Sequence, residues 1–249
     1  MNGFKCIYAI LDSGEKSDLG LEGLNGSSVY TIAYKDISAA VSDVEKGFMK
    51  VSEGKALAYE KIVEDIMIRY DLLPMRFGTL VKNDGEVIGL LQKYYDGFVA
   101  NLARVKRKLE YGLKILWTAE KHILEKSAIN EGEDSNVFDQ LRGNSPSRKY
   151  LTEKFKEYRS EKALLKEAER IIEDIHKPLQ ELSSLSKSRK VSSEKIFFDA
   201  TYLVEKEKKD AFVERFKKLN GMHRDVKCLL TGPWPPYNFI EQLSEVRDL

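Results

Sequence analysis

Apolar and polar residues along the first seventy positions follow first a strand pattern and then a helical one. Residues 4–11 (FKCIYAIL) form a short, β-rich run followed by a turn-forming polar stretch, which predicts a buried strand. The runs 29–34 and 37–44 are separated by two residues, which predicts a β-hairpin. From Ser52, a predicted N-cap, the spacing becomes helical to residue 70. The predicted apolar face of this helix comprises Leu57, Ile62, Val63, Ile66, Met67 and Tyr70.

The middle of the chain predicts helices bounded by short extended segments. Residues 72–81 (LLPMRFGTLV) contain an early proline, so we expect a loop leading into a short strand. Apolar residues recur at helical spacing over 85–108, which predicts one or two helices. Residues 109–117 (LEYGLKILW) are expected to be a strand that closes the first domain. The polar stretch 126–147 is predicted to be a variable loop or linker.

A long charged helix is predicted to open the last part of the chain. Ser145 and Pro146 form a helix start signal, and the apolar stripe continues to about His176, before Pro178 is expected to break the helix. We expect this helix to fold over its own sheet, although coiled-coil pairing with a partner is an alternative.

A strand at 195–204, a helix at 210–220 and a strand at 226–232 follow one another with short connections. This order is typical of βαβ or split-βαβ units and indicates a ferredoxin-like domain with the long helix as its second cover. We therefore predict an α+β protein of two domains. Residues 1–118 form the N-terminal α+β domain, and residues 119–249 form the ferredoxin-like domain with a tail rich in proline and aromatic residues.

Composition indicates a soluble cytoplasmic protein. The 249 residues are 42% hydrophobic, which is enough for a core, while 41 basic and 40 acidic residues nearly cancel. No global field therefore attracts the chain to nucleic acid or to an anionic membrane. The N-terminal apolar stretch is too short for a signal peptide or a spanning helix. Cys6 and Cys228 lie in separate strand-like segments and are expected to be two buried thiols.

No catalytic chemistry is predicted. His122, His176 and His223 stand alone without metal-ligand spacing, and the chain has no nucleophile elbow, phosphate-binding loop or dinucleotide fingerprint. We therefore expect no enzyme activity, no cofactor and no metal. Arg76 and Glu110 could form a partly buried ion pair across neighbouring strands. We prefer a structural role for this pair over a role as a ligand or partner anchor.

The segment GPWPPYNF at 232–239 combines three prolines with three large aromatic residues. The prolines hold the chain extended and exclude a helix or a central strand. The rings of Trp234, Tyr237 and Phe239 would not ordinarily be left in water. Two uses remain open: an internal clamp on the chain's own domain, or a surface presented to another protein.

Two motifs resemble signatures of the gas vesicle GvpF/GvpL family. GPWPPYNF resembles the C-terminal signature of that family and LPMRFGTL at 73–80 resembles a second one, and they occur in the family's order. The matching positions are Pro74, Arg76, Phe77, Gly78, Thr79, Gly232, Pro233, Trp234, Pro235, Pro236, Tyr237 and Phe239. The similarity extends over nearly the whole chain except 126–147, and it does not distinguish the two sibling types.

The resemblance implies an accessory or minor structural protein of the gas vesicle, a gas-filled buoyancy compartment. Its implied partners are the small hydrophobic shell protein and other vesicle proteins, and the family implies no catalytic residues. Candidate partner-binding or clamp residues are Arg76, Phe77, Trp234, Pro235, Pro236, Tyr237 and Phe239. An alternative, based on fold analogy alone, is a regulatory module that binds a small ligand through the ferredoxin-like domain.

Overall fold

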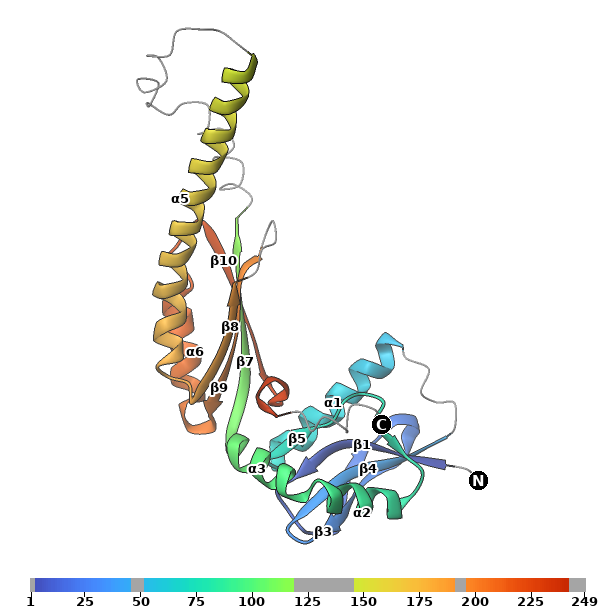
Figure 1. The fold of residues 1–249 in the computed structure, drawn as a ribbon. Coiled ribbons are helices and arrows are strands. Elements are labelled where there is room, and N and C mark those ends of the chain that lie inside the picture. The colour runs from blue at the N-terminus through green and yellow to red at the C-terminus, as the bar shows by residue number, and fades with distance from the viewer. Residues whose placement is uncertain (1–2, 46–51, 119–145, 191–195, 242–249) are drawn as a thin grey trace. The chain divides into compact units, whose positions relative to one another are not determined.

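The computed structural model describes residues 3–45, 52–118, 146–190 and 196–241 (Figure 1). The chain divides into two compact units. Unit 1 comprises Met1–Tyr111, Leu203–Glu207 and Gly232–Leu249, and unit 2 comprises Gly112–Tyr202 and Lys208–Thr231. This division differs from the predicted boundary after residue 118, because the Pro/aromatic tail returns to the N-terminal unit.

Unit 1 is built on an antiparallel sheet in the order β2-β3-β4-β1-β5, with β6 also paired to β1. Its strands are β1 (Gly3–Leu11), β2 (Asp18–Glu22), β3 (Ser28–Tyr34), β4 (Ile37–Glu45), β5 (Leu72–Pro74) and β6 (Leu80–Val81). The predicted hairpin is confirmed, since Tyr34 pairs with Ile37 and Lys35 takes a positive φ of 53° in the turn. Strand β2 lies in a stretch that the sequence pattern assigned to a turn.

Among the described residues, three helices cover this sheet: α1 (Glu53–Arg69), α2 (Asp84–Lys93) and α3 (Tyr95–Val105). Ser52 caps α1 as predicted, because its side chain accepts a hydrogen bond from the backbone N–H of Lys55. The predicted apolar face was wrong at Leu57, which is 64% exposed. Tyr59, which the periodicity did not include, is fully buried.

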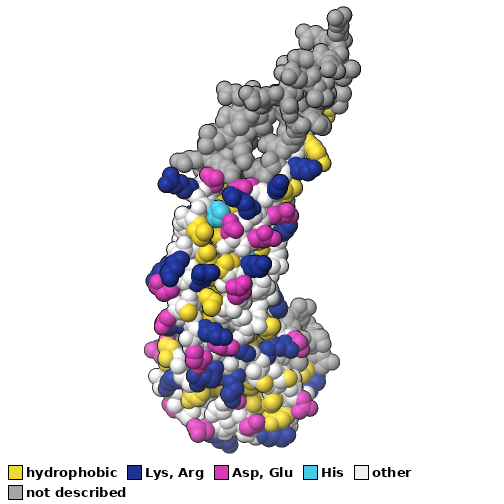
Figure 2. Space-filling model, turned by 90° about the vertical axis from the view of Figure 1, so that its left-hand side faces the viewer, with side chains coloured by type: hydrophobic (Ala, Val, Ile, Leu, Met, Phe, Trp, Pro, Cys, Tyr) yellow, Lys and Arg dark blue, Asp and Glu magenta, His cyan; other side chains and the backbone are white. Residues whose placement is uncertain are grey.

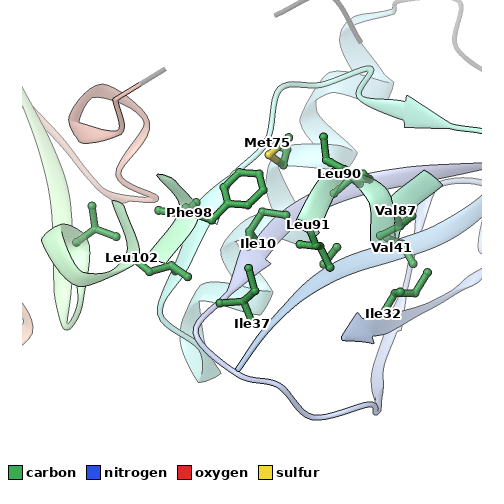
Figure 3. Close-up of a cluster of buried hydrophobic side chains, with 14 of the residues drawn as sticks. Ile10, Ile32, Ile37, Val41, Met75, Val87, Leu90, Leu91, Phe98 and Leu102 are labelled. Atoms are coloured by element: carbon green, nitrogen blue, oxygen red, sulfur yellow. The ribbon is translucent and has the colours of Figure 1, made fainter. Parts of the chain in front are cut away.

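Side chains from the two faces of the sheet form two separate apolar cores. On one face, Ile10, Ile32 and Val41 pack against the α2 and α3 side chains, including Leu91 and Phe98 (Figure 3). On the other face, residues of the same strands pack against α1. Because successive strand residues point to opposite faces, β1 supplies both cores. Unit 1 is therefore a sheet between two helical layers.

Unit 2 has the ferredoxin-like order of elements. Its elements are β7 (Lys108–Trp117), α5 (Pro146–Gln180), β8 (Leu185–Lys190), β9 (Ile196–Glu205), α6 (Lys209–Leu219) and β10 (Val226–Trp234). Residues 108–111, 203–205 and 232–234, at the ends of β7, β9 and β10, fall in unit 1. The sheet order β10-β7-β9-β8 is that of a βαββαβ fold whose fourth strand lies beside the first. Helices α5 and α6 lie on one face of this sheet (Figure 1). Strand β7 therefore belongs to this sheet, whereas the sequence pattern assigned it to the first domain.

Helix α5 continues past the predicted stop. Pro178 lies inside the helix, which ends two residues later at Gln180, so the predicted break before Pro178 was wrong. A proline this close to the C-terminus removes a single backbone hydrogen bond near the last turn. The buried stripe of α5 consists of Ala168, Ile171, Ile175 and Leu179. The predicted linker 126–147 lies outside the described residues except for its last two positions, which begin α5.

The expectation of two buried thiols is confirmed. Cys6 and Cys228 are both buried free thiols. No helix within the described ranges is long and apolar enough to cross a membrane.

Candidate functional site

The segment that contains Arg76 folds as a tight turn against β1. The Thr79 N–H and hydroxyl both donate to the Arg76 carbonyl, at 3.1 and 2.9 Å. Gly78 has a φ of 97°, which an L side chain rarely adopts, so glycine is required there. The turn is tied to the sheet at both ends, because Met75 N donates to Tyr8 O and Ile7 N donates to Thr79 O.

Tyr59 of α1 fixes the inner side of this turn. Its hydroxyl donates to the Met75 carbonyl at 2.9 Å and lies 3.3 Å from the Arg76 carbonyl. Its ring packs edge-on against Phe77, with centroids 5.4 Å apart. Burial raises the pKa of Tyr59 well above its ordinary value, so the hydroxyl stays protonated and remains a donor.

The C-terminal segment packs into unit 1 through its prolines and its last aromatic ring. Pro235 and Pro236 are buried, and a short 3₁₀ turn, Tyr237–Phe239, follows them. Phe239 is 3% exposed and belongs to the same core cluster as the inward-facing side chains of α2 and α3. Trp234, in contrast, is 38% exposed.

Glu110 of β7 binds Asn238 of the C-terminal segment. Its carboxylate accepts a 2.8 Å hydrogen bond from the backbone N–H of Asn238 and a 2.6 Å bond from the Asn238 side-chain amide. The Glu110 residue is only 4% exposed. Because a buried carboxylate is costly without donors, these two bonds hold the segment in place.

Glu60 of α1 accepts a hydrogen bond from Tyr237. The Tyr237 hydroxyl lies 3.2 Å from both carboxylate oxygens of Glu60 and donates to them. Burial raises the pKa of Tyr237, and the negative charge of Glu60 raises it further. Burial also raises the pKa of Glu60. The phenol is therefore protonated at neutral pH and is a permanent donor to this carboxylate.

Asn101 of α3 holds the end of the described segment. Its side-chain oxygen accepts from the Glu241 N–H at 2.8 Å, and its amide donates to the Glu241 carbonyl at 3.2 Å. The Glu241 carboxylate also pairs with Arg104 at 2.6 Å. One side chain thus reproduces both hydrogen bonds of a strand neighbour.

Adjacent residues of α1 bring the two motifs together. Tyr59 binds the turn at 75–79, and Glu60 binds the segment around Tyr237, although the two motifs are more than 150 residues apart. We call this arrangement the latch. Tyr59 holds the turn at 75–79. Glu60, Asn101 and Glu110 hold the C-terminal segment by accepting hydrogen bonds from the Tyr237 hydroxyl, the Glu241 N–H and Asn238.

The predicted site residues divide into buried and exposed groups. Pro235, Pro236 and Phe239 are buried, whereas Arg76 and Trp234 are exposed. The structure does not bring Arg76 and Glu110 together in an ion pair, because the Arg76 side chain lies at the surface while the buried Glu110 carboxylate accepts from Asn238.

The sequence analysis missed the latch residues Tyr59, Glu60, Asn101 and Asn238. An available signal was the asparagine inside the proline-rich motif, since a neutral amide donor is suited to an enclosed acceptor.

The histidines do not form a site within the described ranges. His176 hydrogen-bonds to the Tyr202 hydroxyl at 2.6 Å, and burial lowers its pKa. His223 lies 3.2 Å from the Asp174 carboxylate, and His122 lies outside the described residues. No group of three or more His, Cys, Asp or Glu side chains among the described residues could hold a metal ion.

Comparison with known proteins gives one consistent result. The family model "Gas vesicle synthesis protein GvpL/GvpF" matches residues 5–241. Gas vesicle protein F2 of Halobacterium salinarum is 23% identical over 239 residues, which cover 94% of this chain and 90% of that protein. Gas vesicle protein L1 of the same organism is 25% identical over 264 residues, with 96% and 91% coverage.

Two crystal structures share the fold. GvpF from Anabaena sp. PCC7120 aligns with a TM-score of 0.80 and 21% identity, covering 97% of this chain and 99% of that one. GvpF from Microcystis aeruginosa aligns with a TM-score of 0.76 and 17% identity, covering 97% and 100%.

Proposed function

The chain belongs to the GvpL/GvpF family of gas vesicle synthesis proteins, and on this premise we propose that it is an accessory or minor structural protein of gas vesicle assembly. In this role it binds the small hydrophobic shell protein and other vesicle proteins, resides at the gas vesicle, and acts without catalysis. The family match over residues 5–241 is the observation that carries the proposal.

Proteins named for the gas vesicle that cover at least 90% of this chain add support, because they match both units rather than one module. The geometry of the two motifs suggests that their buried and exposed residues have different roles. Buried members such as Phe239 hold the segment to unit 1, while the exposed Trp234 and Arg76 side chains are free to contact a partner.

The test is co-purification of the full chain with the shell subunit. We expect wild type to retain the shell subunit and Trp234→Ala or Arg76→Ala to lose it while remaining folded. Phe239→Ala is the matched comparison, since it removes a buried ring of the same motif and should affect folding first. Absence of the shell subunit from the wild-type sample would contradict direct shell binding.

A genetic test addresses the broader role. Deleting the gene from a gas vesicle cluster should reduce the number of intact vesicles seen by electron microscopy, and the wild-type gene should restore them. Unchanged vesicle numbers after deletion would contradict an assembly function.

A further inference from the structure

The sheet of unit 2 has one face without a helix among the described residues. The Tyr202 hydroxyl contacts His176 of α5, and its ring packs against Phe212 of α6, so this position of β9 faces the helices (Figure 1). Phe198 also contacts His176. Because side chains alternate along a strand, Asp199 and the other intervening residues of β9 face the opposite side. We call this side the open sheet face.

One contact between strands and the burial patterns of the others extend the open sheet face across all four strands. Arg189 of β8 donates to Asp199 at 2.8 Å, which places both on this side. On β7, Lys114 is exposed between the fully buried Leu113 and Ile115. On β10, Lys227 is exposed beside the buried Cys228. Lys114 and Lys227 therefore lie on the open face of neighbouring strands.

The charge of the open sheet face differs from that of the whole chain. Among the described residues of unit 2, this face carries four basic residues, Lys114, Lys187, Arg189 and Lys227, and one acidic residue, Asp199. Glu205 continues the same alternation of β9 but lies in unit 1, and the chain as a whole carries a net charge of +1. Lys114 and Lys227 are both exposed and form no ion pair with any described residue. On the helix-covered side, basic and acidic side chains are intermixed (Figure 2). Lys114 and Lys227 thus give the open sheet face positive charge that no carboxylate among the described residues pairs with.

Apolar side chains lie between these cations. Leu229 of β10 is 47% exposed and Leu185 of β8 is 46% exposed, each two positions from a lysine on the same face. We propose that the open sheet face docks an acidic, amphipathic segment of another gas vesicle protein. Its carboxylates lie opposite Lys114 and Lys227, and its apolar side chains pack on Leu229. That the partner is a vesicle protein rests on the proposed function.

Phe197 is the ring that the alternation of β9 places on this side, and it is covered, which favours a peptide over a nucleic acid. Trp117 of β7 stacks on Phe197 of β9, with ring centroids 4.3 Å apart and planes inclined by 26°. Phe197 is only 8% exposed. Single-stranded nucleic acid binds to open aromatic faces on which bases stack, and here one ring covers the other.

A defined peptide tests the site in the full-length protein. The probe is a fluorescein-labelled octapeptide of alternating glutamate and leucine, and the matched peptide has lysine in place of glutamate. Fluorescence anisotropy should show binding of the acidic peptide alone. The double variant Lys114→Glu/Lys227→Glu should raise its Kd about tenfold or more, because attraction becomes repulsion.

The control variant Lys166→Glu/Lys218→Glu makes the same charge change at exposed positions on α5 and α6. It should change the Kd by less than about twofold, since both sites lie in the helical layer. Equal weakening by both variants, or equal binding of both peptides, would overturn the proposal. Tighter binding of an eight-nucleotide thymidine strand than of the acidic peptide would overturn it in favour of nucleic acid.

A complementation experiment, in which vesicle formation is measured, distinguishes failure of this docking proposal from failure of the proposed function. In a host that lacks the gene, the Lys114→Glu/Lys227→Glu variant should fail to restore vesicles while the control variant restores them. Full restoration by both variants would refute a vesicle protein as the occupant. If deletion itself changes nothing, the proposed function fails, and the peptide titration still decides whether the face binds acidic segments.

Discussion

Replacement of Asn238 by alanine measures how firmly the C-terminal segment is latched. The change removes the side-chain amide that donates to Glu110 at 2.6 Å and keeps the backbone donor at 2.8 Å. A hydrogen bond to a charged group contributes about 1.5–3 kcal/mol to stability. We expect the free energy of unfolding to fall by about 2 kcal/mol.

The assay is urea unfolding combined with hydrogen exchange. Hydrogen exchange should show faster exchange of the segment from Trp234 to Glu241, because a weakened latch opens more often. Asn220→Ala is the matched control, since Asn220 is exposed and its backbone N–H, not its side chain, makes the helix-cap hydrogen bond. The control should change the free energy of unfolding by less than about 0.5 kcal/mol.

A double-mutant cycle tests whether the loss belongs to the Glu110–Asn238 pair. Glu110→Gln removes the charge and places an amide donor near the Asn238 N–H. The coupling energy between Glu110→Gln and Asn238→Ala should exceed about 1 kcal/mol for residues in direct contact. A loss in Asn238→Ala below about 0.5 kcal/mol, or additive effects in the cycle, would refute the latch.

Three further substitutions test how the C-terminal segment packs on unit 1. Phe239→Ala should lower the free energy of unfolding by about 3–5 kcal/mol, because it empties a core position; a loss under about 1 kcal/mol in urea unfolding would contradict this. Gly232→Ala should cost at least about 1 kcal/mol, since φ is 114° and a Cβ would lie 2.7 Å from the Glu110 carbonyl; an unchanged melting temperature would argue against it. Glu60→Gln should stabilise the protein at pH 7. Burial raises the pKa of Glu60 in the folded state, so the neutral carboxyl is favoured by folding and the charged carboxylate is disfavoured. The stability contributed by the neutral form is complete below the unfolded-state pKa and is lost as pH rises through the folded-state pKa, whereas the neutral glutamine does not titrate. The gain in Glu60→Gln should disappear below about pH 4, and a constant difference between the two proteins across pH would contradict the assignment.

Elements with a strong local signal were predictable from the sequence. Strand β1, the β3–β4 hairpin and the Ser52 cap of α1 each depend on residues close in sequence, and all three are confirmed. The ferredoxin-like domain was predictable because its strand–helix–strand pattern is local. The whole family assignment likewise followed from two short motifs, and the family match confirms it.

Features that depend on distant partners were not predictable. Strand β8 (LSKSRK) is an exposed edge strand without apolar alternation, so no periodic signal marks it. The partner of Glu110 was predicted to be Arg76 on the grounds of charge, yet it is the neutral Asn238, 128 residues away. Leu57 fitted the apolar stripe of α1 but is exposed, because periodicity does not tell how wide the covered part of a helix is.

The contacts of the latch show that most residues of the two motifs have a structural role within unit 1. Adjacent residues of α1, Tyr59 and Glu60, hold the turn at 75–79 and Tyr237, so both motifs are largely explained by contacts within unit 1. Of the three aromatic rings in the C-terminal segment, Phe239 lies in the core and Tyr237 is bonded to Glu60, while Trp234 is 38% exposed. Contacts within unit 1 therefore account for two rings, and Trp234 is the ring that the proposed function would use to contact a partner. Comparing Trp234→Ala with Phe239→Ala separates these two requirements inside one motif.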